Sequence, residues 1–136
     1  MVTTGRPVDV GYWNALAVSQ FRELVSFRAL DALREMALVC FDDETKGHPA
    51  RIYTAGQVAL AIRLGWIPLD ANRRQRHAAV ERMSRLFREL RDAKAIEQVK
   101  HHAPGSTAHW RLLLDVPEKG KRGRSTVVRN PQLFDG

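Results

Sequence analysis

The sequence has little cysteine and no long apolar segment. Its single cysteine, Cys40, cannot form an internal disulfide, and its place in the apolar run MALVCF indicates a small core residue rather than a nucleophile. The chain lacks an apolar run of about 18 residues, and its amino terminus lacks the apolar core of a signal peptide. These absences predict a cytoplasmic protein that does not enter a membrane.

Recognisable catalytic motifs are absent as well. The chain has no phosphate-binding glycine loop, no GxSxG motif and no cysteine–histidine pair at a plausible spacing. Asp42, Asp43 and Glu44 are adjacent in one loop, which is more typical of a solvated acidic turn than of a metal cage. His101 and His102 point to opposite faces of a predicted strand and have no cysteine nearby, which argues against a metal site. We therefore expect a protein that is not an enzyme and that holds neither metal nor cofactor.

Acidic residues are too few to balance the basic ones. The 136 residues include 22 lysines and arginines against 15 aspartates and glutamates, which gives a net charge of +7 and an isoelectric point of about 10.3. A soluble protein this basic usually meets a polyanion, either nucleic acid or an acidic membrane surface. The basic segments lack the exposed aromatic edge of membrane-surface helices, which favours nucleic acid. The length and the 44% hydrophobic content fit one domain with a modest core.

Apolar residues recur at helical spacing through most of the chain and alternate near its end. Helices are predicted over residues 9–24, 27–41, 54–65 and 70–95. Strands are predicted over residues 96–102 and 107–115, joined by the turn APGS, and RIY at 51–53 is at most a short strand. The apolar face of the last strand is predicted to contain Ala108, Trp110, Leu112 and Leu114.

Capping residues mark the expected helix ends. Ser26 and Asp70 are the expected N-caps of the second and fourth helices, and Thr54 with Gln57 has capping-box spacing at the third. Gly65 is expected to end the third helix in the left-handed conformation. The buried stripe of the second helix is predicted to be Phe27, Leu30, Leu33, Met36, Ala37 and Cys40.

Three regions follow from this pattern. Residues 1–23 form an N-terminal arm or short helix, residues 24–116 the main domain, and residues 117–136 a basic, flexible tail. Three apolar residues in or next to the first region either cover the core of their own chain or hold two copies together as a homodimer. They are Trp13, Phe21 and Leu24.

The expected order of helix, short strand, two helices and β-hairpin is that of a winged helix-turn-helix domain, mainly α with a small β-hairpin (α+β). Here the sequence resembles a known family. LAIRLG at 60–65 resembles the second helix of that fold. MSRLFRELRDAKAIE at 83–97 resembles the end of the recognition helix, and PGSTAHWRLLL at 104–114 resembles the wing.

The wider pattern covers roughly residues 24–115 and includes a helix ending in MAL and the loop HPARIYTAG. It is similar to small winged-helix proteins of actinobacterial phages, plasmids and related mobile elements, which are often compared with replication initiators. The resemblance implies sequence-specific binding to double-stranded DNA, for replication initiation or transcription control. Such families usually have glycine where this chain has Lys94, so we expect the fourth helix to continue for longer.

The predicted helix over residues 70–95 is unusually basic, with six arginines between Asn72 and Leu90. Its apolar side, which includes Met83 and Phe87, turns the basic side outward when it is buried. A major groove about 12 Å wide admits one such helix, and arginine offers paired donors to guanine. Glu81 is expected to accept from cytosine or to orient Arg85. The predicted base-reading residues are Arg74, His77, Ala78, Glu81, Arg82 and Arg85.

Residues beside this helix and on the wing are predicted to contact DNA phosphates. They are Thr54, Gln57, Arg73, Arg88, Lys100, His102, Ser106, Thr107, His109 and Arg111. For Thr54 and Gln57, simple helix capping is an equal alternative.

Two other readings of the basic helix remain open. Its charges are an ordinary solvated surface, or the protein is an interaction adaptor that docks the helix on an acidic protein. Near the end of the chain, Gln132, Leu133 and Phe134 resemble part of the motif with which bacterial proteins dock on the replication sliding clamp, which adds replication proteins to the candidate partners.

Overall fold

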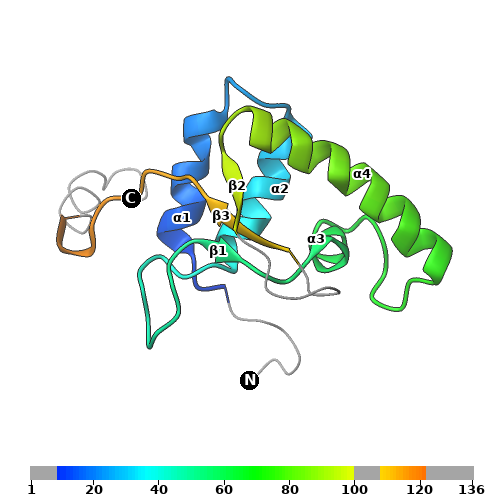
Figure 1. The fold of residues 1–136 in the computed structure, drawn as a ribbon, viewed down its shortest axis with the longest axis horizontal. Coiled ribbons are helices and arrows are strands. Elements are labelled where there is room, and N and C mark those ends of the chain that lie inside the picture. The colour runs from blue at the N-terminus through cyan, green and yellow to red at the C-terminus, as the bar shows by residue number, and fades with distance from the viewer. Residues whose placement is uncertain (1–8, 100–107, 122–136) are drawn as a thin grey trace, which may run out of the picture.

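Helices and a small sheet make up the fold in a computed structural model, which describes residues 9–99 and 108–121 (Figure 1). The helices are α1 (Tyr12–Ala17), the 3₁₀ helix η1 (Val18–Phe21), α2 (Phe27–Leu38), α3 (Gln57–Arg63) and α4 (Arg73–Asp92). The strands are β1 (Ile52–Tyr53), β2 (Ile96–Val99) and β3 (His109–Leu112). The predicted α-rich α+β class is confirmed.

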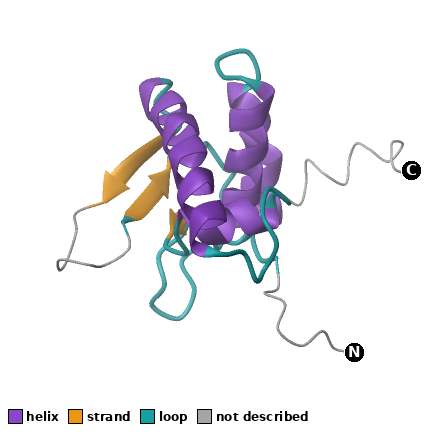
Figure 2. Cartoon of the chain, turned by 90° about the vertical axis from the view of Figure 1, so that its right-hand side faces the viewer, coloured by secondary structure: helices purple, strands orange, loops and turns teal. Residues whose placement is uncertain are grey.

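The three strands form one antiparallel sheet in the order β1-β3-β2, which lies to one side of the helices (Figure 2). The predicted pairing of the last two strands is confirmed, with Ile96 opposite Leu112. The short strand β1 adds to the other edge of β3, a pairing that the sequence pattern does not predict. On the inner face, Trp110 meets Phe87 of α4 edge to face, with ring centroids 5.2 Å apart.

One hydrophobic core joins all of these elements. Its fully buried members include Leu33 of α2, Leu60 of α3 and Met83 of α4. Residues from α1 and η1 belong to the same core, so part of the N-terminal region covers the core of its own chain. Those residues are Ala17, Val18 and Phe21.

Two apolar residues near the start of α2 remain outside the core. Phe27 is 78% exposed, so its predicted place on the buried stripe is wrong. It is the first residue of α2, and the inward side of this helix begins at Ala29. Leu24, in the connection before α2, is 63% exposed.

A buried polar residue, Asn14, ties α1 to the rest of the fold. Its side-chain amide donates to the carbonyl oxygens of Cys40 at 2.8 Å and Phe41 at 2.9 Å, and its backbone N–H donates to the Asp42 carboxylate at 2.7 Å. The preceding Gly11 lies so close to α2 that a Cβ atom there would come within 1.9 Å of the Ala37 carbonyl oxygen. These hydrogen bonds therefore fix α1 in place, and the backbone at Gly11 lies too close to α2 for any residue with a side chain.

Helix starts agree with prediction only at α2, where Ser26 accepts a bond from the backbone N–H of Ala29. The expected capping box at Thr54 is wrong, because α3 begins at Gln57 and its N-cap is Gly56. Tyr53, buried in β1, donates its hydroxyl to the Gly56 carbonyl at 2.6 Å and so holds this entry to the helix.

The fourth helix also begins later than predicted. Asn72, not Asp70, is its N-cap, and it forms a reciprocal capping box with Gln75. Asp70 lacks such a partner, because the residue three positions later is Arg73. The segment before Asn72 instead forms a turn in which the Ala71 N–H donates to the Pro68 carbonyl.

Two helices, α3 and α4, end with a residue in the left-handed conformation. As predicted, Gly65 is left-handed (φ +78°), and the next residue, Trp66, donates to the Ala61 carbonyl of α3. At the end of α4, Lys94 takes this role with φ +62°, and Ala95 donates to the Leu90 carbonyl at 2.8 Å. The expected continuation of α4 is therefore wrong. Its end at Asp92 lets Ala95 enter the core, where it is fully buried.

Cys40 is a core residue, as predicted. Burial raises the pKa of its thiol to about 12, although the charge of Arg51 opposes the shift. At neutral pH the side chain is therefore a thiol that packs as a small apolar group. Within the described ranges, no helix combines the length and the apolarity needed to cross a bilayer.

Candidate nucleic-acid interface

The rotation of α4 is set by its apolar side. Met83, Phe87 and Leu90 are buried against α2, α3 and the sheet. Burial of such side chains stabilises the fold by about 2 kcal/mol each, so rotation of the helix would cost several kcal/mol. The basic side of α4 consequently faces outward, as predicted.

The outward positions form a continuous ridge along α4. In chain order the ridge consists of Arg74, His77, Ala78, Glu81, Arg85 and Arg88, all of them exposed. The helix is 20 residues long, and its amino-terminal turns extend past α3 (Figure 1). A long exposed ridge whose amino-terminal part extends past α3 can enter a groove or lie against a partner surface.

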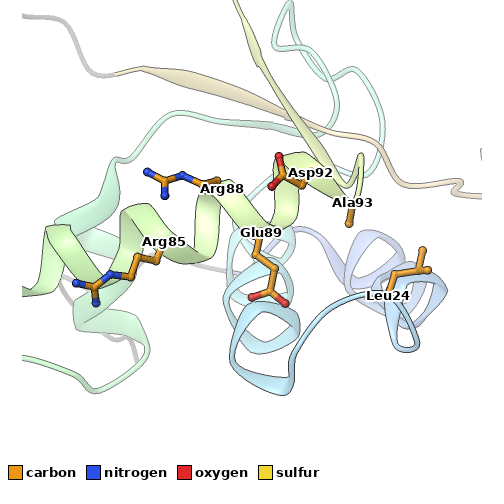
Figure 3. A pocket seen from close by; sticks show the side chains of 6 residues that line it. All are labelled: Leu24, Arg85, Arg88, Glu89, Asp92 and Ala93. Atoms are coloured by element: carbon orange, nitrogen blue, oxygen red, sulfur yellow. The ribbon is translucent and has the colours of Figure 1, made fainter.

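The arginines of this ridge have no acidic partners among the described residues. Glu89 lies one turn after Arg85, but its carboxylate accepts from the Ser26 backbone N–H at 2.6 Å and from the Ser26 hydroxyl at 3.0 Å. Figure 3 shows Arg85 and Glu89 pointing apart. Glu81 lies 3.5 Å from His77, so the expected orientation of Arg85 by Glu81 is not seen. No ion pair among the described residues therefore neutralises Arg74, Arg85 or Arg88.

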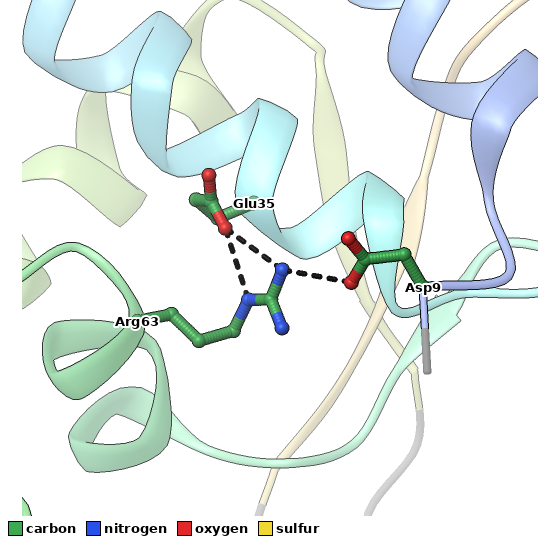
Figure 4. Close-up of polar contacts among 3 residues, drawn as sticks. All are labelled: Asp9, Glu35 and Arg63. Carbon is green, nitrogen blue, oxygen red and sulfur yellow. Dashed lines mark hydrogen bonds and ion pairs between the residues drawn. The ribbon is translucent and has the colours of Figure 1, made fainter. Parts of the chain in front are cut away.

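One basic residue of α3 differs from this pattern. Arg63 lies between two carboxylates, with Nη2 2.9 Å from Glu35 Oε1 and 3.1 Å from Asp9 Oδ1 (Figure 4). Its side chain is only 23% exposed. Arg63 therefore links α3 to α2 and to the N-terminal segment, and has little charge to offer a ligand.

The residues predicted to contact phosphate differ in their exposure and in their side-chain partners. Arg73 and Arg88 are exposed on α4, and Thr54 is exposed before α3. Gln57 lies 3.4 Å from the Ser84 hydroxyl, so its amide faces α4 rather than solvent alone. Arg111 pairs with Glu97 across the sheet at 2.8 Å.

Of the remaining residues predicted on the wing and in the tail, the structure describes His109. His109 is half-buried at the start of β3. The other predicted residues of the wing and the tail lie outside the described ranges. They are Lys100, His101, His102, Ser106, Thr107, Gln132, Leu133 and Phe134.

Two residues that the sequence pattern did not suggest lie beside the ridge. Trp66, in the turn after α3, has its ring under the guanidinium of Arg82, 4.0 Å from the ring centroid. Arg28, from the first turn of α2, lines the same recess as these two residues. Arg82 thus lies at the flank of the ridge and is held by an aromatic face.

In the described part of the chain, no group of three histidine, cysteine or acidic side chains could hold a metal ion.

Comparison of the chain with protein-family models, with curated proteins and with solved structures finds no match in any of the three. The resemblance to winged-helix proteins of mobile elements therefore stays a prediction.

Proposed function

We propose that the protein binds double-stranded DNA in a sequence-specific manner, with the ridge of α4 in the major groove. The observation that carries this proposal is the exposed arginine ridge without internal acidic partners. Like charges on one helix repel each other, and DNA phosphates relieve this repulsion while releasing counterions. Arg74 and Arg85 then read guanine, and Ala78 allows close approach to the base edges.

The arrangement of the elements supports the same proposal. The order α2, β1, α3, α4, β2 and β3, with β3 central in the sheet, is compatible with a winged helix-turn-helix domain in which α4 is the recognition helix. The segment between β2 and β3 is then the wing that contacts the backbone. A role in replication initiation or in transcription control, on a phage or a plasmid, follows the sequence resemblance.

A second candidate function is that of an adaptor for an acidic protein. The exposed side chains of Leu24 and Phe27 favour it, because Leu24 lines the same shallow pocket as Arg85 and Arg88 (Figure 3). Interfaces between proteins combine such apolar residues with arginine. A DNA reader does not require the apolar part of this surface.

Selection of bound duplexes from a random pool, followed by affinity titration at several salt concentrations, separates the two functions. We expect one preferred sequence, with affinity that falls steeply as salt rises. A palindromic or repeated site would indicate a homodimer on DNA, and a single site would indicate a monomer. Weak, uniform binding to every duplex would contradict the proposal and favour the adaptor.

A further inference from the structure

A small basic recess lies beside the ridge, where α4 passes the start of α2. Its walls come from three separate parts of the chain: α2, the turn after α3, and α4. The lining residues are Arg28, Trp66, Arg82, Arg85 and Leu86. At about 130 Å³ the recess is well below the volume of a usual small-molecule site, but it can admit one small charged group.

Three of the residues that line the recess are arginines, and none of the lining residues carries a carboxylate. Arg82 is fixed by the aromatic face of Trp66, and none of the three forms an ion pair with any described residue. Glu89, one turn after Arg85, bonds instead to Ser26. Three guanidinium groups at one recess repel each other, and an anion held among them removes this cost.

The chemistry of the recess selects a phosphate group. Guanidinium forks match phosphate oxygens in pairs, and arginine keeps its charge at every physiological pH. The recess lies on the flank of α4, and a helix in the major groove has a phosphate strand along each flank. Arg85 belongs to both surfaces, so one side chain joins the ridge to the recess.

We propose that this recess binds one backbone phosphate of the DNA duplex, and that Arg28 and Arg82 thereby fix the register of α4 in the groove. The inference rests on the proposed function. It adds Arg28 to the interface and assigns Arg82 to the backbone rather than to a base. Because the contact is made to phosphate, it strengthens binding without altering sequence preference.

The test uses Arg28→Gln, with Arg34→Gln as the matched control. Arg34 also lies on α2, with a side chain 43% exposed, but it pairs with Asp31 at 3.0 Å and does not line the recess. We expect Arg28→Gln to weaken binding to the selected duplex and to unrelated duplexes alike by about tenfold, the size of one charge-assisted hydrogen bond. The slope of log affinity against log salt should fall by about 0.9, whereas Arg34→Gln should change both quantities much less.

Neutral methylphosphonate groups, placed singly along the selected duplex, locate the phosphate. At one position we expect wild-type protein to lose more affinity than Arg28→Gln does, because the variant keeps only Arg82 on that phosphate. Arg28→Lys should restore most of the salt slope, because it keeps the charge. Melting temperatures of the two Arg28 variants should match the wild type, since this side chain is exposed.

Each alternative outcome overturns a defined claim. If wild-type protein prefers one duplex but Arg28→Gln behaves like Arg34→Gln, the recess assignment is wrong and the proposed function stands. If inorganic phosphate shifts the NMR signals of the recess residues but Arg28→Gln binds DNA with unchanged affinity, the recess is a site for a free anion. Absence of any duplex preference removes the proposed function itself.

Discussion

Arg63 of α3 and Arg85 of α4 are both basic residues on adjoining helices, yet their surroundings differ completely. Arg63 is mostly buried between Glu35 and Asp9, and its ion pairs join three segments of the chain. Arg85 is exposed, and the nearest acidic residue one turn along, Glu89, is engaged with Ser26. The comparison teaches that an arginine in this fold stabilises the chain where acids surround it, and is available to a ligand where acids are bonded elsewhere.

Exchange of each arginine for alanine gives the largest effect and tests the comparison directly. Arg85→Ala should reduce affinity for the selected duplex by about 5- to 150-fold and relax base preference, because a base contact contributes about 1–3 kcal/mol. Its melting temperature should be unchanged. Arg63→Ala should do the reverse, lowering the free energy of unfolding by about 1 kcal/mol and leaving duplex affinity within twofold of wild type (about 0.4 kcal/mol or less).

Arg34→Ala is the control for both variants, since its ion pair with Asp31 is exposed and contributes little. Affinity by fluorescence anisotropy and stability by urea denaturation give the two readouts. Equal loss of affinity in Arg85→Ala and Arg63→Ala would mean that the exposed and the buried arginines are not distinct in function.

A double-mutant cycle on Ser26 and Glu89 sharpens the comparison. We expect Ser26→Ala and Glu89→Gln each to lower the free energy of unfolding by about 1 kcal/mol, because each removes part of the cap of α2. The double variant should lose less than the sum, since the two residues share one contact. Additive losses in urea denaturation would show that the Ser26 hydroxyl and Glu89 do not act on each other, which would leave only the bond from the Ser26 backbone N–H to hold Glu89 away from Arg85.

Lys94→Gly gives the smallest expected effect, and it separates charge from backbone conformation at the end of α4. The left-handed conformation costs a lysine about 1 kcal/mol that glycine avoids, so we expect the variant to be more stable by about 0.5–1 kcal/mol in urea denaturation. Gly65→Ala, at the equivalent place after α3, should be destabilised by a similar amount. A less stable Lys94→Gly would indicate that the lysine side chain itself stabilises this turn.

The sequence predicted the features that depend on long periodic patterns. The apolar residues of α4 repeat over twenty residues, so their spacing determined which side is buried and which side carries the arginines. The last two strands were predicted for the same reason, since alternation from Trp110 to Leu114 is clear. Each of these predictions depends only on the spacing of apolar residues within one helix or one strand.

Features for which the sequence offers several equivalent local partners, or which join distant segments, were not predicted. Asp70 and Asn72 are both good N-caps, and the choice between them depends on a glutamine three residues ahead and on a turn before the helix. Glu81 has a basic residue four positions away on either side, and spacing alone does not favour His77. The recess of Arg28 and Trp66 joins segments nearly forty residues apart, which no local pattern reveals.

The Asn14 bonds have a consequence for how this chain can be divided or rebuilt. They join the first helix to the loop that follows α2, so the residues ahead of position 24 act as one wall of the domain rather than as an attachment to it. A shortened chain that starts at α2 would expose the core and leave the Cys40 and Phe41 carbonyls and the Asp42 carboxylate without their bonds to Asn14. Fusions to other proteins should therefore be joined ahead of residue 9, where the added chain leaves this wall intact.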